Sequence, residues 1–207
     1  MARARARRTI ENHYRRYGFG LIAGVDEVGR GCLAGPVMAA AVVLDPARHV
    51  PGLADSKLLT ARARDRLFDL ITARALAWAV GSADPPEIDR YNIHRASLHA
   101  MARAVASLAP QPDLVLVDAF RIEGLPGAQR AVAGGDRLSA AIAAASIVAK
   151  VTRDRLMNDL HRTDSRYGFD RHKGYATAAH LAAVAEHGYS EAHRRSFKPA
   201  SLFDTLD

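Results

Sequence analysis

Two apolar runs joined by a glycine-rich segment constrain the fold of this chain more than any other feature. Leu21 and Ile22 lead into the first run, and the second run spans residues 37–44. Short apolar runs bounded by glycine and proline are more typical of buried strands than of helices. The sequence therefore predicts two buried strands, one on each side of residues 23–36.

The segment between these strands carries two adjacent carboxylates, Asp26 and Glu27, followed by Gly29, Arg30 and Gly31. Neighbouring strand residues point to opposite faces, so both carboxylates share one side only where the strand ends or bulges. A carboxylate in an apolar run is costly unless a cation or a hydrogen-bond donor compensates it. The glycines let the backbone approach another molecule closely, and arginine binds phosphate well. The alternative interpretation is that Asp26 caps a turn and Glu27 is solvated.

The charge of the chain favours a polyanionic partner. The formal net charge is +7 and the isoelectric point is about 10.0, which indicates nucleic acid, although many basic surfaces only keep proteins dissolved. The 207 residues suffice for one sizeable core, and no apolar run is long enough to span a membrane. Cys32, the single cysteine, excludes an internal disulfide and fits a reducing cytoplasm.

The rest of the chain alternates predicted helices and strands. A basic arm, mobile or helical, is predicted over residues 1–18, and no apolar core follows it, so it is not a secretory signal. Apolar periodicity predicts strands at residues 75–81, 114–118 and 131–133 and helices at residues 60–73, 87–108, 139–159 and 177–186. Thr60 is expected to cap the first of these helices, and Pro85 and Pro86 to end the strand before the second.

Beyond residue 163 basic and aromatic residues interleave, as in the segment from His172 to Tyr175. Such a pattern suits a surface that grips a nucleic-acid backbone and stacks on its sugars. The alternative is a small satellite hydrophobic cluster. One domain with a helical C-terminal appendage accounts for the whole chain.

Two further carboxylates stand at predicted strand ends. Asp118 ends the strand at residues 114–118, and Asp136 follows the last predicted strand through a pair of glycines. Sites in α/β proteins gather at the carboxyl ends of strands, so these acids converge with Asp26 and Glu27 if the strands are neighbours. Hard divalent cations relieve the repulsion in such a cluster, and two ions can promote hydrolysis of a phosphodiester. The alternative is that Asp118 and Asp136 are independent turn or cap residues.

Several motifs, taken together and in order, resemble bacterial ribonuclease HII, the type 2 ribonuclease H family. They lie at residues 24–31, 55–57, 117–118, 135–136, 143–154 and 172–175. The match covers about residues 20–198, and the first motif and the alanine-rich run at residues 143–154 are highly specific. The resemblance implies an α/β, RNase H-like fold, with a central mixed five-stranded sheet flanked by helices and a small helical C-terminal region.

The same resemblance implies a metal-dependent endoribonuclease that hydrolyses the RNA strand of RNA–DNA hybrids. It implies incision 5′ of single ribonucleotides embedded in duplex DNA, leaving 3′-hydroxyl and 5′-phosphate ends, with Mg²⁺ or Mn²⁺ as the metal. The implied role is removal of ribonucleotides and RNA primers, by a monomer in the cytoplasm. The chain would then comprise the basic arm (1–18), a catalytic domain (19–162) and a helical substrate-binding region (163–207) packed on that domain.

The resemblance assigns roles position by position. Metal binding and catalysis fall to four acids, Asp26, Glu27, Asp118 and Asp136. Contact with the ribonucleotide falls to Gly29, Arg30 and Gly31, stacking at the junction to Tyr175, and phosphate binding to Lys57. Four more residues lie in matching segments and are predicted from their charge to contact phosphate: Lys150, Arg153, His172 and Lys173. Asp154 is expected to pair with Arg153 or Lys150.

Three residues depart from the family pattern. Cys32 stands where proline is frequent, Leu58 where a second lysine is common, and Ala119 where glycine commonly follows the aspartate. Ala119 is expected to shift the loop after Asp118, which affects rate more than function.

Two other functions remain open. One is another nuclease or an integrase with the same architecture, because fold does not fix substrate. The other is a module that binds hybrids without cutting them. At the C-terminus, the apolar residues 201–203 are predicted either to dock on a sliding clamp or to pack on their own domain or fray.

Overall fold

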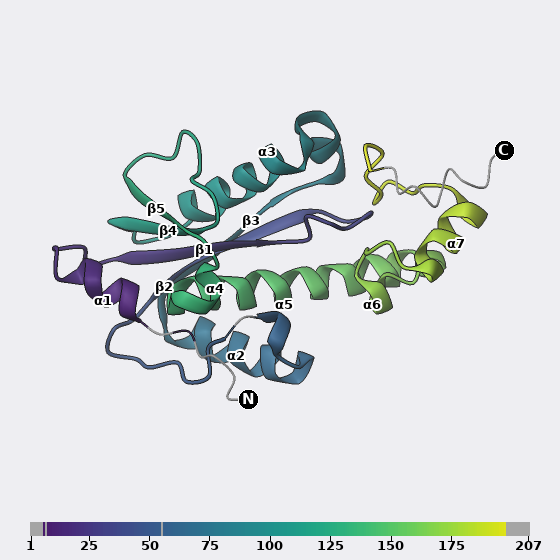
Figure 1. Ribbon diagram of the computed structural model, residues 1–207. Helices are drawn as coiled ribbons and strands as arrows, with labels where there is room; N and C mark the ends of the chain where they lie inside the picture. Colours follow the sequence, from purple (N-terminus) through teal and green to yellow (C-terminus); the bar gives the residue numbers. More distant parts are fainter. Residues whose placement is uncertain (1–5, 7, 55, 198–207) are drawn as a thin grey trace.

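The computed structural model describes residues 6, 8–54 and 56–197, in which five strands form one mixed sheet (Figure 1). The strand order is β3-β2-β1-β4-β5. The first three strands are antiparallel neighbours, whereas β4 and β5 run parallel to β1. Their bounds are β1 (Ile22–Val28), β2 (Val37–Leu44), β3 (Ala75–Ala83), β4 (Leu114–Asp118) and β5 (Ala128–Val132). The predicted mixed five-stranded sheet is confirmed.

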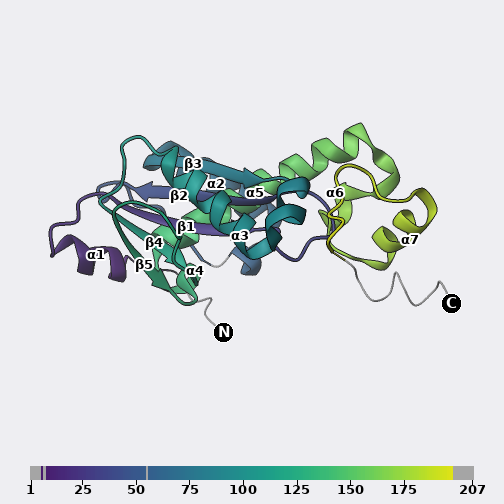
Figure 2. The ribbon, with the colours of Figure 1, turned by 90° about the horizontal axis from the view of Figure 1, so that it is seen from above.

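Helices cover both faces of this sheet. α3 (Pro85–Ala106) packs on one face, and α5 (Ala140–Thr163) together with α2 (Ala61–Arg74) packs on the other (Figure 1). The shorter helices are α1 (Thr9–Arg15), α4 (Gly135–Leu138), α6 (Phe169–His172) and α7 (Ala178–His187), with 3-10 segments at Ser56–Leu58 and Ser165–Tyr167. α6 and α7 lie beyond the end of the sheet, at the far end of α5 (Figure 2).

The close contact between α5 and β1 explains the alanine-rich sequence at the start of that helix. A Cβ atom at Gly24 would lie 2.1 Å from the carbonyl carbon of Ala141, so strand and helix touch backbone to backbone. The residues of α5 from Ala140 to Ala145 are buried, and all except Ile142 are alanine. Small side chains on both elements therefore set how near α5 comes to the central strand.

Glu11 attaches the N-terminal helix to the rest of the molecule. Its side chain is buried, and its Oε1 accepts hydrogen bonds from Ser139 Oγ at 2.7 Å and from the N–H of Ala141 at 2.8 Å. A carboxylate at a helix N-terminus is favourable because it satisfies free N–H groups and the helix dipole. The described part of the predicted arm is thus a docked helix, and residues 1–5 and 7 lie outside the described residues.

Local sequence signals place most of the element boundaries correctly. Thr60 caps α2 as predicted, accepting from the N–H of Ala63 at 3.3 Å. β3 ends at Ala83, just before Pro85 and Pro86, as predicted, and both prolines occupy the first turn of α3, where a missing N–H costs nothing. Residues 201–203 lie outside the described residues. Within the described residues, no helix is both long enough and apolar enough to span a bilayer.

Candidate active site

The parallel pairing of β1 and β4 brings carboxylates from both strands to one edge of the sheet. The ladder ends at the pair Val25–Val117, and Asp26 and Asp118 follow directly on their strands. Parallel strands point their carboxyl ends to the same edge, so both acids lie at that edge, where Asp26 still pairs with Ala40 of β2 and Asp118 with Val132 of β5. Glu27 follows Asp26 in β1, and its N–H donates to Asp26 Oδ1 at 2.8 Å.

The electrostatics of this edge reflect how close the acids are. Burial, followed by the charges of Glu27 and Asp118, raises the pKa of Asp26 well above its usual range. Burial also raises the pKa of Glu27, with Asp118 adding to the effect and Arg30 opposing it. The Nη1 atom of Arg30 lies 3.3 Å from Glu27 Oε1. Three carboxylates therefore share one partly dry environment with one arginine beside them.

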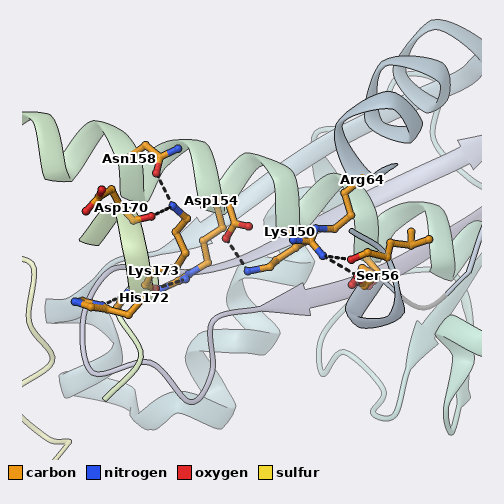
Figure 3. A network of polar contacts seen from close by, with 12 residues as sticks. Ser56, Arg64, Lys150, Asp154, Asn158, Asp170, His172 and Lys173 are labelled. Carbon is orange, nitrogen blue, oxygen red and sulfur yellow. Dashed lines mark hydrogen bonds and ion pairs between the residues drawn. The ribbon is translucent and has the colours of Figure 1, made fainter. Parts of the chain in front are cut away.

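Two buried serines, Ser56 and Ser146, form hydrogen bonds next to Asp26. The Ser146 side chain forms a hydrogen bond that lowers the pKa of Asp26, against the effect of burial. Ser146 Oγ also lies 2.7 Å from Ser56 Oγ. The backbone carbonyl of Ser56 in turn accepts a hydrogen bond from Arg64 at 3.1 Å (Figure 3). Sequence reasoning missed both serines because they carry no charge, although each lies inside a family motif.

Asp136 reaches this edge through α4. The N–H of Gly135, the first residue of α4, donates to Asp118 Oδ1 at 2.8 Å. Asp136 follows in the chain and is 8% exposed. Because Asp136 is the next residue after Gly135, the two predicted acids lie in adjacent segments.

The donor set suits a hard divalent cation in its chemistry. Carboxylate oxygens are the ligands that Mg²⁺ and Mn²⁺ prefer, and a cation would stabilise the charged forms of acids that repel one another. Among the described residues, no three His, Cys, Asp or Glu side chains are already grouped as a cation site. The fit rests on the mutually repelling carboxylates of Asp26, which is buried, and of Glu27 and Asp118, which are half-buried.

Gly29 and Gly31, at the two ends of the turn they form with Arg30, have different surroundings. Gly29 has a φ of +89°, and a Cβ there would lie 2.2 Å from Nε of Arg153. Gly31 is exposed, and a Cβ there would meet nothing within 4 Å. Gly29 therefore makes room for the interior of the protein, and only Gly31 leaves open space for another molecule. The sequence had indicated the same role for both.

Arg153 is buried, which corrects the prediction that it contacts phosphate. Its side chain has no exposed surface. The guanidinium donates to the carbonyl oxygens of Pro36 at 2.9 Å, Lys173 at 2.8 Å and Ala34 at 3.0 Å. With its donors committed to main-chain carbonyls, Arg153 holds the segment after the Gly29–Gly31 turn instead.

A second buried arginine, Arg194, holds the same segment from the C-terminal region. It donates to the carbonyl oxygens of Gly29 at 2.6 Å, Arg30 at 2.9 Å and Gly35 at 2.9 Å. Burial lowers the pKa of Arg194 to about 10, which leaves the guanidinium charged at neutral pH. Sequence reasoning missed this role, because Arg194 stands in a basic, aromatic run that indicated a surface.

Two predicted phosphate-binding lysines, Lys150 in α5 and Lys173 directly after α6, have protein partners. Lys150 Nζ lies 2.7 Å from Asp154 Oδ1, so Asp154 pairs with Lys150, one of its two expected partners (Figure 3). Lys173 Nζ donates to Asn158 Oδ1 at 2.5 Å and to the carbonyl oxygen of Asp170. Both ammonium groups lie along α5, and their contact with phosphate remains a prediction.

His172 uses both ring nitrogens inside the protein. Nε2 lies 2.7 Å from the carbonyl oxygen of Tyr167, and Nδ1 accepts from the N–H of Gly174 at 3.2 Å. Burial lowers the pKa of His172, which favours the neutral ring. This arrangement speaks against the predicted phosphate contact and indicates that His172 shapes the turn before Tyr175.

Two aromatic rings and one lysine remain accessible. Tyr175 is 43% exposed, and Lys57 is exposed in the 3-10 segment Ser56–Leu58. Phe120, two residues after Asp118, is 46% exposed, with the Arg30 guanidinium 5.7 Å from its ring centre. Sequence reasoning missed Phe120. The main chain ties Tyr175 to the carboxylate edge, because the N–H of Leu33 donates to Gly174 O at 2.8 Å.

Comparison with known proteins identifies the family. The model of the Ribonuclease HII family matches residues 23–200. Ribonuclease HII of Burkholderia thailandensis is 56% identical over 187 residues, which cover 90% of this chain and 87% of the relative. Ribonuclease HII of Azoarcus sp. is 58% identical over 179 residues, or 86% of this chain and 88% of the relative.

Solved structures agree on the fold. The ribonuclease H2 from Pyrococcus horikoshii superimposes with a TM-score of 0.72 at 24% identity, covering 89% of this chain and 96% of the other. Bst-RNase HIII in complex with Mn²⁺ superimposes with a TM-score of 0.70 at 22% identity, covering 88% of this chain and 68% of the other. RNase HII in its complex with PCNA from Archaeoglobus fulgidus superimposes with a TM-score of 0.72 at 25% identity, covering 86% of this chain and 96% of the other. These likenesses confirm the RNase H-like fold. By sequence, the chain belongs to the ribonuclease HII family and is a type 2 ribonuclease H, an endoribonuclease that acts on RNA–DNA hybrids.

Proposed function

We propose that this enzyme incises duplex DNA on the 5′ side of single embedded ribonucleotides, leaving 3′-hydroxyl and 5′-phosphate ends. The observation that carries the proposal is the open main chain at Gly31, next to the carboxylate edge of the sheet. The 2′-hydroxyl is what distinguishes RNA from DNA at a given sugar, and an uncovered backbone can approach it within hydrogen-bonding distance. Recognition and hydrolysis would then take place side by side.

Divalent metal ions, Mg²⁺ or Mn²⁺, would be held by Asp26, Glu27, Asp118 and Asp136. When bound, such ions supply activation of a water and stabilisation of the leaving oxygen. The chain itself contributes acids fixed by their surroundings: Asp26 contacts Ser146, and Asp118 is bonded to Gly135. The Mn²⁺ complex of Bst-RNase HIII supports a metal in this fold.

Selection of the junction would involve Arg30 and Tyr175. Arg30 is half-buried beside Glu27 and would hold the phosphate next to the ribonucleotide. The exposed ring of Tyr175 would pack against the following sugar, where a deoxyribose fits best. Because the N–H groups of Leu33 and Ala34 both donate to Gly174 O, the two recognition elements keep a fixed spacing.

A pair of matched duplexes tests the proposal. One carries a single ribonucleotide, the other is its all-DNA counterpart, and each is incubated with purified protein in Mg²⁺, in Mn²⁺ or in chelator. We expect one cut, 5′ of the ribonucleotide, and only with metal. Equal cutting of both duplexes would identify another nuclease activity, and binding without cutting would identify a binding module. Either result contradicts the proposal.

A contact of residues 201–203 with a sliding clamp is proposed for the same enzyme, acting as a monomer. The complex of an archaeal RNase HII with PCNA supports a clamp partner in this family. Gel filtration of the full chain with a bacterial clamp should show co-elution that a chain ending at residue 199 loses. Equal co-elution of both chains with the clamp, or no co-elution of the full chain, contradicts the contact. The monomer is a separate prediction, which a dimer mass for the enzyme alone would contradict.

A further inference from the structure

Arg194 bonds to main-chain carbonyls at both ends of the segment that joins β1 to β2. The contacts are to Gly29 and Arg30 at one end and to Gly35 at the other. The acceptors are carbonyl oxygens and not carboxylates, so the guanidinium orients peptide groups. A planar guanidinium with several donors in a fixed fork suits this task, whereas a lysine ammonium offers no fork.

The orientation of these carbonyls determines where the neighbouring N–H groups point. In a planar trans peptide the C=O and the next N–H point in opposite directions. The carbonyls of Gly29 and Arg30 point at the buried guanidinium, so the N–H groups of Arg30 and Gly31 point away from it. Among the described residues, none accepts a hydrogen bond from either N–H. A Cβ at Gly31 would meet nothing within 4 Å, so open space lies beside this pair of donors.

The position of Arg194 is itself fixed by its flanking backbone. Its N–H donates to Leu33 O at 2.9 Å, and the Ala192 carbonyl accepts from Gly35 at 2.7 Å. Downstream, Asp89 accepts from the N–H of Arg195 at 2.9 Å. Arg194 is therefore attached to α3 and to the segment that it orients, and it does not depend on substrate for its position.

We propose that Arg194 is a positioning residue for recognition of the ribose 2′-hydroxyl. By holding the carbonyls of Gly29 and Arg30, it presents the N–H groups of Arg30 and Gly31 as a preorganised pair of donors to the ribonucleotide. The inference rests on the proposed incision at embedded ribonucleotides. It adds a residue from the C-terminal segment, which touches no substrate, to the determinants of selectivity.

The kinetic test uses Arg194→Lys, with Arg195→Lys as the matched control. Arg195 is the adjacent residue and its side chain is exposed. We expect Arg194→Lys to lower kcat/KM on the single-ribonucleotide duplex about tenfold or more, the effect of weakening hydrogen bonds from a charged group. Affinity for the all-DNA duplex should stay unchanged, and the control should match the wild type. Unchanged kcat/KM, or an equal loss of all-DNA binding, would overturn the proposal.

Nuclear magnetic resonance separates this inference from the proposed function, because it needs no substrate. In the free protein, the amide signals of Arg30 and Gly31 should shift in Arg194→Lys and stay in place in Arg195→Lys. Unmoved signals in both variants contradict the positioning role even if the enzyme cuts as proposed. If these signals shift in Arg194→Lys but the wild-type enzyme cuts both duplexes equally, the result contradicts the proposed function instead.

The wild type alone gives a further measurement, in case Arg194→Lys fails to fold. A guanidinium bonded to three carbonyls should show separate, slowly exchanging Nη proton signals, with Overhauser contacts to the α protons of Gly29. A single averaged Nη signal without those contacts would overturn the proposal.

Discussion

Glu11 Oε1 lies 2.7 Å from Ser139 Oγ, although 128 residues separate the two in the chain. Ser139 is the N-cap of α5, and α4 with Asp136 precedes it directly. Glu11 of α1 therefore helps to cap the N-terminus of α5, next to α4, which carries the proposed metal ligand Asp136.

Replacing Glu11 by alanine should destabilise the fold. The change leaves the Ser139 hydroxyl and the Ala141 N–H without their shared acceptor. Hydrogen bonds to a charged group are worth about 1.5–3 kcal/mol, so we expect a loss of about 2 kcal/mol in the free energy of unfolding. Urea titration measures it, with Glu123→Ala, on an exposed loop, as the control. Equal midpoints for both variants would contradict the capping role.

Gly24→Ala should lower the stability of the fold more than a substitution at an exposed site. The added methyl group would lie 2.1 Å from the Ala141 carbonyl carbon, so α5 must move away from β1. Overpacking of this kind costs about 1–3 kcal/mol, and backbone on both sides puts this site at the upper end. Gly31→Ala is the matched control, because its Cβ position is open. Calorimetry should show a lower Tm for Gly24→Ala alone, and equal Tm values would show that α5 is not fixed by this contact.

Asp118→Asn should abolish cleavage and leave hybrid binding within a few-fold of normal. The amide oxygen can still accept from the N–H of Gly135, so the junction between β4 and α4 survives. The negative charge proposed to hold metal is lost. Cleavage is measured at saturating Mg²⁺ and binding by fluorescence anisotropy with chelator present. Wild-type cleavage by the variant would remove Asp118 from the catalytic set.

Tyr175→Ala should lose activity at a single embedded ribonucleotide, and Tyr175→Phe should keep most of it. The ring is 43% exposed. Its backbone contacts to His172 and His180 do not involve the ring, so the turn survives both substitutions. Loss of one stacking contact costs about 1–3 kcal/mol, which predicts about a tenfold or greater decrease in kcat/KM. An unaffected Tyr175→Ala variant would show that the ring does not select the junction.

Acid should destabilise the C-terminal region through His180 and His193. Their Nε2 atoms lie 3.0 Å apart, and His180 Nδ1 lies 2.9 Å from Tyr175 O. Because the N–H of Ser190 donates to His193 Nδ1 at 3.0 Å, a neutral His193 donates from Nε2 to a neutral His180. Burial lowers the pKa of both rings to about 4.

The sign of the pH effect follows from those values. Between pH 6.5, the usual pKa, and about pH 4 the unfolded chain binds more protons, so stability is complete above pH 6.5 and decreases towards pH 4. The loss is on the order of 3 kcal/mol for each ring. Urea midpoints at several pH values should show a flatter profile for the double variant His180→Gln/His193→Gln. His49→Gln, at an exposed site, should keep the wild-type slope. An unchanged slope in the double variant would contradict this origin.

The sequence predicts the carboxylate edge because its determinants are local. Asp26 and Asp118 each follow an apolar strand, and parallel strands end together. The two buried arginines show where this approach fails, since charge indicates a surface and contacts with distant carbonyls leave no local mark. A signal for Arg153 was present all the same. It lies four residues after Ala149 and four before Met157, on the face of α5 that the structure buries. Glu11 had no comparable signal, because its partners lie at least 128 residues away.

The hydrogen bond between Arg194 and Gly29 also relates the site to the order of protein synthesis. The ribosome makes the Gly29 carbonyl 165 residues before the arginine that holds it. The carbonyls of Gly29 and Arg30 are therefore made long before the guanidinium that holds them. The proposed selectivity for embedded ribonucleotides would then be acquired only after the segment around Arg194 has been made and has folded back onto the residues between β1 and β2.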